Sequence, residues 1–324
     1  MLTADHVQWA YRLFLDREPE SKQVVKEMLK QHATTRDLRY AFTRSPEFRF
    51  RHPFLEFSHK EIIYDTSFGF RQVLNLADSA VAGMILNEAY EPRETSFICK
   101  ACKTGDVVLD IGANIGYYTL LMAKLVGPTG FVYAFEPRED FCDYIRRSVS
   151  ENEFDPYCSI HCCALADFEG TVQFRIHPKR GLDPSDPNYY STCYLAGSES
   201  DKDPEAFIDV KVEILDKILA ANPERRVAFI KIDVEGAEYL VFRGAEELLR
   251  RDRPVILSEI FGPQLENVSK VNTLTYVKFL ESFGYKCHTI GDGGAIAPIP
   301  DVKAFFTAKE FLKSPVVNVV FKAA

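Results

Sequence analysis

The chain has 324 residues, 46% of them hydrophobic and 27% charged, which is ordinary for a soluble globular protein with one large and one small domain. Its net charge of −8 argues against a nucleic-acid partner held on a basic face. The first residues show no basic segment followed by an apolar run, and no stretch is apolar over the width of a bilayer. We therefore expect a cytoplasmic protein with no signal peptide and no membrane span.

Three short helices are predicted within the first 51 residues, which form a small helical domain. Apolar side chains recur there at helical spacing. They are Val7, Ala10, Tyr11 and Phe14, then Val24, Val25, Met28 and Leu29, then Leu38, Ala41 and Phe42. Helices of this size bury little surface alone, so we expect either a separate module or a cap on the main domain. Residues 52–104 are predicted as a linker and a helical lead-in.

The same region resembles a family of small helical domains that is related to phycobilisome linkers. The resemblance rests on Tyr11–Glu20 and, downstream, on Ser45–Phe48. The sequence departs from that family at Asp16, where glycine is usual. Members occur in bacterial surface and glycan-associated proteins. The resemblance therefore implies that these helices localise the protein or present a substrate.

From Gly105 to the end of the chain, strands alternate with helices. Strands are predicted at 106–111, 131–135, 157–165, 171–176, 227–232 and 255–260, with two more near 285 and at 316–321. This alternation predicts an α/β domain over residues 105–324, with a doubly wound, mostly parallel, Rossmann-like sheet. Residues 178–207 are polar and too long for an ordinary connection, so we expect a lid, a substrate loop or a surface insertion there.

Eight cysteines in a chain of this length are too few for a disulfide scaffold. Cys99 and Cys102 form one C-x-x-C pair, but no second pair or nearby histidines complete a zinc site. Cys162 and Cys163 are adjacent in a predicted strand and point to opposite faces. We expect reduced, buried thiols.

The central motif is the run DIGANIG, which starts at Asp110 between a predicted strand and a predicted helix. Tight turns at Gly112 and Gly116 let a backbone approach a ligand and direct N–H groups at its polar end. The dinucleotide pattern G-x-G-x-x-G fails, because Asn114 replaces the second glycine and Tyr117 the third. A pyrophosphate needs close backbone contact at those positions, so the motif favours a cofactor without one.

Two acidic residues follow later strands. Glu136 ends the next predicted strand, where a carboxylate accepts hydrogen bonds from ribose hydroxyls. The alternative for Glu136 is a favourable interaction with the N-terminus of the helix that follows. Asp167 comes after the strand that ends at Leu165 and suits the amino group of an adenine.

Together these residues resemble the FkbM-type family of S-adenosylmethionine-dependent methyltransferases, most of which are O-methyltransferases. The resemblance extends from about Glu88 to near the end of the chain. Its motifs are Gly105–Thr119, Ala134–Pro137, Ala164–Asp167, Ile230–Glu238 and Arg253–Ile260. It implies the class I methyltransferase fold and S-adenosylmethionine as the cofactor. The implied cofactor-binding residues are Asp110, Gly112, Asn114 and Gly116 at the methionine part, Glu136 at the ribose and Asp167 at the adenine.

The fourth of these motifs holds the best catalytic candidates. Lys231 and Asp233 are two apart on a predicted strand and share a face, and Glu259 ends a neighbouring strand. Either carboxylate suits a base that takes the acceptor's proton while the methyl group moves from sulfonium to oxygen. We predict all three as catalytic residues and no metal ligand, although the two carboxylates also suit a divalent cation. Glu235 and Glu238 are interpreted as acids at a helix N-terminus.

The predicted function is O-methylation of a hydroxyl group on a sugar, a glycan or a secondary metabolite. A nicotinamide-dependent dehydrogenase is the second possibility, and Asn114 and Tyr117 argue against it. The third is a non-catalytic cofactor-binding or scaffold protein that works through its N-terminal helices. The sequence identifies neither the acceptor nor the oligomeric state.

Overall fold

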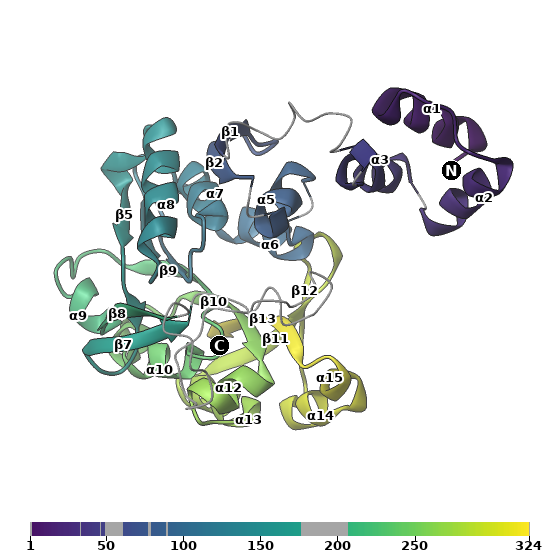
Figure 1. Ribbon diagram of the computed structural model, residues 1–324. Helices are drawn as coiled ribbons and strands as arrows, with labels where there is room; N and C mark the ends of the chain where they lie inside the picture. Colours follow the sequence, from purple (N-terminus) through teal and green to yellow (C-terminus); the bar gives the residue numbers. More distant parts are fainter. Residues whose placement is uncertain are drawn as a thin grey trace. The chain divides into compact units, whose positions relative to one another are not determined.

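The computed structural model describes residues 2–32, 34–45, 47–48, 61–76, 79–88, 90–175 and 207–323. Almost all of the loop predicted at 178–207 lies outside these ranges. The chain divides into two compact units, Met1–Lys60 and Glu61–Ala324 (Figure 1). None of the described helices is long and apolar enough to cross a membrane.

In the described part of the first unit, helices α1 to α3 surround a small hydrophobic core of their own. Each helix begins after a residue whose side chain accepts a backbone N–H of the first turn, namely Thr3, Ser21 and Thr34. The helices are α1 (Ala4–Leu15), α2 (Lys22–Gln31) and α3 (Thr35–Arg44). The buried residues are Val7, Ala10, Tyr11, Leu15, Val25, Leu38 and Phe42. The predicted helical spacing therefore marks the side chains that form this core.

In the described part of the second unit, eight strands form one sheet in the order β12-β11-β13-β10-β9-β3-β4-β5. The strands are β3 (Val107–Ile111), β4 (Phe131–Phe135), β5 (Cys158–His161), β9 (Val227–Ile232), β10 (Val255–Phe261), β11 (Tyr285–Ile290), β12 (Ile296–Pro298) and β13 (Val316–Ala323). From β5 to β10 the neighbours are parallel, whereas β13, β11 and β12 pair antiparallel. The predicted mostly parallel sheet is confirmed, with an antiparallel edge.

Helices cover both faces of this sheet (Figure 1). Successive strand residues point to opposite faces, so Val108 enters one hydrophobic cluster and Leu109 the other. Helices α5 to α8 pack in the first cluster, and α10, α11, α13 and α14 in the second. The helices are α5 (Ser79–Leu86), α6 (Pro92–Ala101), α7 (Tyr117–Val126), α8 (Glu139–Glu151), α9 (Leu215–Leu219), α10 (Glu238–Arg243), α11 (Glu246–Arg251), α12 (Gly262–Val268), α13 (Thr273–Ser282), α14 (Val302–Thr307) and α15 (Lys309–Lys313). This three-layer arrangement is the predicted Rossmann-like, doubly wound α/β fold.

The segment before β3 differs from the predicted linker. Strands β1 (Glu61–Asp65) and β2 (Arg71–Asn75) form an antiparallel hairpin, and Phe70 and Leu74 are buried in the first cluster of the main sheet. Residues 61–75 are therefore a hairpin and not a linker, whereas the expected helical lead-in corresponds to α5 and α6. Strands this short show too few alternations to be distinguished from a loop by pattern alone.

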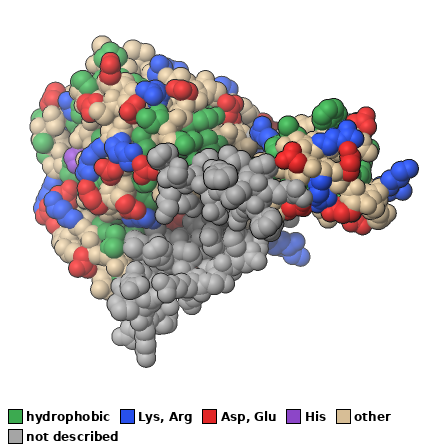
Figure 2. Space-filling model, turned by 45° about the horizontal axis from the view of Figure 1, so that its top comes forward, with side chains coloured by type: hydrophobic (Ala, Val, Ile, Leu, Met, Phe, Trp, Pro, Cys, Tyr) green, Lys and Arg blue, Asp and Glu red, His purple; other side chains and the backbone are tan. Residues whose placement is uncertain are grey.

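The predicted strand at 157–165 is two strands in two different sheets. Its end, β6 (Ala164–Leu165), joins a small sheet with β7 (Gly170–Arg175) and β8 (Phe207–Glu213) in the order β6-β8-β7. On the described surface seen in Figure 2, basic side chains are interspersed with acidic ones, so this face presents mixed charge and not a basic field.

One pair of cysteines corrects the expectation of reduced thiols. Cys142 in α8 and Cys162 after β5 form a disulfide, with 6.1 Å between their Cα atoms. That separation is within the usual range for disulfides. The two residues are 20 apart in the sequence, and only the packing of α8 beside β5 brings them together. Cys99 and Cys102 remain free thiols.

Candidate active site

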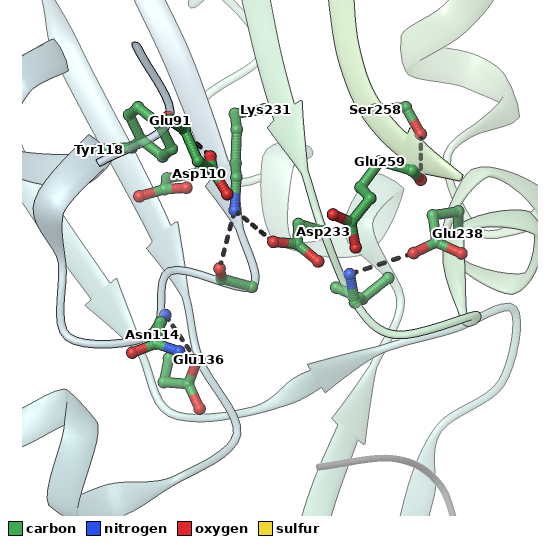
Figure 3. A network of polar contacts seen from close by, with 12 residues as sticks. Glu91, Asp110, Asn114, Tyr118, Glu136, Lys231, Asp233, Glu238, Ser258 and Glu259 are labelled. Atoms are coloured by element: carbon green, nitrogen blue, oxygen red, sulfur yellow. Dashed lines mark hydrogen bonds and ion pairs between the residues drawn. The ribbon is translucent and has the colours of Figure 1, made fainter. Parts of the chain in front are cut away.

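A pocket lies where β3, β4 and β9 end. The strands that follow β3 in the sequence lie on both sides of it, with β4 on one side and β9 on the other, so the strand order reverses there. Ligands of open α/β sheets bind at such a reversal point. Five predicted site residues line the pocket, namely Gly112, Asn114, Glu136, Lys231 and Asp233. The structure thus brings together residues from three separate sequence motifs. Figure 3 shows the side chains of Asn114, Glu136, Lys231 and Asp233.

The backbone N–H groups of the turn after β3 donate hydrogen bonds to oxygens of the protein itself. The N–H of Asn114 donates to the Glu136 carboxylate at 2.8 Å. The other N–H groups of residues 112–116 donate to oxygens of the turn itself or to the carbonyl of Phe135. None of these five groups is therefore directed at a phosphate. This geometry agrees with the interpretation that the cofactor contains no pyrophosphate.

Gly112 is required for a different reason than the sequence indicates. Its φ is 79°, and a Cβ atom there would lie 1.8 Å from the carbonyl oxygen of Asp233. The close approach is therefore to the protein's own chain, and it fixes the turn after β3 against the turn after β9. Gly116 also has a positive φ of 87°, but it does not line the pocket, and its Cβ would meet the Ile145 side chain.

Glu136 is a buried acceptor on the pocket wall. Its exposed fraction is 6%, and its two oxygens accept the N–H groups of Asn114 and Arg138 at 2.8 and 3.0 Å. Burial raises the pKa of Glu136 to about 7, although both N–H donors favour the charged form. Each carboxylate oxygen can accept more than one hydrogen bond, so Glu136 can still bind a ribose diol.

Lys231 contacts both the turn after β3 and the turn after β9. Its Nζ lies 3.2 Å from the carbonyl oxygen of Gly112 and 3.4 Å from the carboxylate of Asp233 (Figure 3). Burial opposes a charged ammonium, but surrounding carboxylates outweigh it and raise the pKa of Lys231. These are the carboxylates of Asp233, Asp110, Glu91 and Glu259.

Three predicted acids do not line the pocket. Asp110 is fully buried; one of its carboxylate oxygens accepts from the Thr119 hydroxyl at 2.5 Å, and the other has no hydrogen-bond partner among the described residues. The carboxylate of Asp167 lies 3.5 Å from Arg243. Glu259 lies beside Asp233 in Figure 3, and this neighbouring carboxylate, followed by burial, raises its pKa to about 10.

Sequence reasoning did not assign Tyr90, Tyr118 or Glu235 to the site, and all three line the pocket. The rings of Tyr90 and Tyr118 line the pocket, and the Tyr118 hydroxyl donates to Glu91 at 2.7 Å. Tyr118 lies in α7, and Tyr90 and Glu91 directly precede α6, where no strand-tip pattern marks them. Glu235 also lines the pocket, with a φ of 52°. Its signal was the acid–glycine pair with Gly236 directly after a strand, a sequence typical of a left-handed turn.

A family model described as the methyltransferase FkbM domain matches residues 110–287. The chain belongs to this family. It is 28% identical to methyltransferase sdnD of Sordaria araneosa over 43% of this chain and 60% of that protein. It is 27% identical to 31-O-demethyl-FK506 methyltransferase FkbM of Streptomyces tacrolimicus over 45% of this chain and 61% of that protein. The chain thus spans about three fifths of the length of these two relatives.

A crystal structure of methyltransferase FkbM from Methylobacillus flagellatus is similar over 75% of this chain and 52% of that chain, with 14% identity and a TM-score of 0.41. S-adenosylmethionine is the cofactor of this family. The pocket fits it, because the buried carboxylate of Glu136 suits a ribose and no N–H group of residues 112–116 is directed at a phosphate. The resemblance of the N-terminal helices to linker domains stays a prediction, since the family model begins at residue 110.

Proposed function

We propose that this FkbM-family chain transfers the methyl group of S-adenosylmethionine to a hydroxyl oxygen of a sugar, a glycan or a secondary metabolite. The observation that carries the proposal is that Glu136, at the tip of β4, and Asp233, after β9, line the same pocket. One carboxylate suits the ribose of the donor, and the other suits the acceptor hydroxyl. Asp167, which pairs with Arg243, stays a candidate for the adenine.

Two further points support an oxygen acceptor. The Streptomyces relative is named as a methyltransferase of 31-O-demethyl-FK506, so an oxygen receives the methyl group in that protein. In this chain, acidic groups gather at the ends of β9 and β10, where a proton acceptor is needed because a hydroxyl must lose its proton as it is methylated. The resemblance of the first residues to glycan-associated domains favours a sugar among the possible acceptors.

When bound, S-adenosylmethionine supplies an electrophilic methyl group, so the chain's own task is to orient the acceptor and remove its proton. The sequence predicts Asp233 for proton removal, with Glu259 second and Lys231 beside them. Within the described residues, Asp233 and Glu259 do not belong to a group of three or more side chains whose ligand atoms lie within 4.8 Å of one another.

The proposal is tested in two steps. Calorimetric titration with S-adenosylhomocysteine should show binding, and titration with NAD should show none. Incubation with donor carrying a labelled methyl group and a library of sugars, glycans and hydroxylated metabolites should then label at least one acceptor on oxygen. Binding of NAD without binding of S-adenosylhomocysteine would refute the donor assignment. Labelling of nitrogen or carbon acceptors alone would refute O-methylation.

A further inference from the structure

Glu235 stands in an unfavourable backbone conformation that its neighbours enforce. Its φ of 52° is in the left-handed region, which glutamate rarely adopts. One oxygen of the buried Glu238 accepts the N–H groups of Val234 and Gly236, at 3.2 and 3.3 Å. A Cβ atom on Gly236 would lie 2.4 Å from the main chain of Gln264. The turn is therefore fixed on both sides of Glu235, and such enforced conformations are concentrated at functional sites.

Among the described residues, the Glu235 carboxylate has no hydrogen-bond or ion-pair partner, unlike those of Asp233 and Glu238. Asp233 pairs with Lys231 at 3.4 Å. Glu235 lines the pocket, and Glu259 does not. Of the three acids around the end of β9, Glu235 is thus the one that both faces the pocket and keeps its lone pairs available to a ligand.

We propose that Glu235, and not Asp233 or Glu259, is the general base of methyl transfer. Asp233 then acts as a positioning residue that holds Lys231 and, through it, the carbonyl of Gly112. The inference rests on the proposed function. In the step, the acceptor's O–H bond breaks and its proton bonds to a carboxylate oxygen of Glu235. The acceptor oxygen bonds to the methyl carbon while the carbon–sulfur bond breaks, and that electron pair stays on the sulfur, which leaves as a thioether.

The electrostatic surroundings of Glu235 suit this role. Burial and the carboxylates of Asp233 and Glu238 raise the pKa of Glu235 to about 8, and the ammonium of Lys231 only partly offsets them. The carboxylate of Glu259 also interacts electrostatically with that of Glu235. A general base works best when its pKa lies near the working pH, because it is then both a strong base and substantially ionised. Methyl transfer should therefore increase as the pH rises through about 8.

The test needs no knowledge of the acceptor. Sinefungin is an analogue of the donor that carries an amine at the position of the transferred methyl group. A base that faces this methyl group forms a charged hydrogen bond with the amine. S-adenosylhomocysteine has no group at that position and cannot form this bond. Glu235→Gln should weaken sinefungin binding by about ten-fold or more and leave the affinity for S-adenosylhomocysteine unchanged. Asp233→Asn should have the smaller effect on the ratio of the two affinities, and the surface variant Glu266→Gln should have none.

The possible results separate the two proposals. If Asp233→Asn lowers the ratio and Glu235→Gln preserves it, Asp233 faces the methyl group and the inference is wrong. If neither variant changes the ratio, it is also wrong. If Glu235→Gln is unstable, Glu235→Asp replaces it, and retention of the full ratio by this shorter acid would overturn the inference. Failure of the unmodified chain to bind S-adenosylhomocysteine would instead overturn the proposed function.

Discussion

The backbone N–H of Asn114 donates to the carboxylate of Glu136 at 2.8 Å, so the turn after β3 is bonded directly to the end of β4. Asn114 has a φ of 53°, a conformation that asparagine adopts more readily than most residues. The second oxygen of Glu136 binds the N–H of Arg138 at 3.0 Å. One carboxylate therefore shapes the pocket and remains available to a ligand.

Substitution of Glu136 tests its role toward the donor. Glu136→Ala removes a charged acceptor worth about 1.5–3 kcal/mol, so calorimetry should show S-adenosylhomocysteine binding weakened by about 10- to 100-fold. Glu139→Ala is the matched control, because Glu139 lies three residues further on and pairs with Arg146 at the surface. A folded Glu136→Ala protein with unchanged affinity would mean that this carboxylate only stabilises the turn and the N-terminus of α8.

Lys231 should be essential for stability as well as for the site. Lys231→Met leaves buried carboxylates without their counter-charge, and we expect it to lower the free energy of unfolding by about 3–5 kcal/mol. Adding Asp233→Asn should restore part of this loss, because the two residues interact directly. Urea unfolding of both single variants and the double variant measures this coupling. Strictly additive changes would show that the ion pair contributes nothing.

Asp233→Asn alone should reduce the rate of methyl transfer more than it reduces the free energy of unfolding.

Stability should decrease as the pH rises. Burial raises the pKa of Glu136 and Glu238 to about 7 and that of Glu235 to about 8, and the Asp233 carboxylate raises that of Glu259 to about 10. Between about pH 4.5 and 10 the native state thus binds more protons than the unfolded state, so the free energy of unfolding falls with pH. We expect the Tm of the ligand-free protein to drop between about pH 5.5 and 8.5, and Glu259→Gln to reduce that slope. A Tm that rises over this pH range would contradict the conclusion that these carboxyl groups have raised pKa values in the native state.

The sequence predicted the strands that carry the site because each is a continuous apolar run that ends in a polar motif. Strands β4 and β9 lie at the predicted residues, and β10 is one residue longer. Lys231 and Asp233 were expected on one face of the same strand, and the Nζ of Lys231 lies 3.4 Å from the carboxylate of Asp233. These features depend on residues close together in the chain, where alternation and turn chemistry are informative.

Contacts between distant segments were not predictable in this way. Tyr118 donates to Glu91, 27 residues earlier, and nothing in either segment indicates the other. The Gly112 conformation is set by the backbone of Asp233, more than a hundred residues away. The disulfide likewise depends on the packing of α8 beside β5. Such pairs follow from the strand order, which the local pattern does not specify.

Reduction of the disulfide should destabilise the second unit. Cys142–Cys162 closes a loop of about 20 residues, for which the loss of chain entropy in the unfolded state corresponds to about 3 kcal/mol. Thermal unfolding with and without a reductant should show a lower Tm in its presence. The double variant Cys142→Ser/Cys162→Ser should have that lower Tm under both conditions. If the reductant leaves the Tm of the unmodified protein unchanged, the bond does not contribute to stability in solution.

The N-terminal unit should unfold independently of the unit that binds the donor. Its core is closed by its own side chains, with the rings of Tyr11 and Phe42 4.8 Å apart and Arg17 paired with Glu47 at 2.6 Å. The hydrophobic clusters of the main sheet include none of these residues. Deletion of residues 1–60 should therefore leave the affinity for S-adenosylhomocysteine unchanged. Activity on the natural acceptor should fall if these helices present the substrate.

Trp9 allows the same question to be asked of the full chain. It is the single tryptophan of the sequence and lies in α1 with 64% of its surface exposed. A ligand stabilises only the unit that binds it, so S-adenosylhomocysteine should raise the unfolding temperature seen by far-ultraviolet circular dichroism and leave the transition of Trp9 fluorescence in place. If the ligand shifts both transitions equally, the two units unfold as one. In that case any loss of activity on deletion would reflect lost stability, and the N-terminal helices would be a structural cap of the methyltransferase.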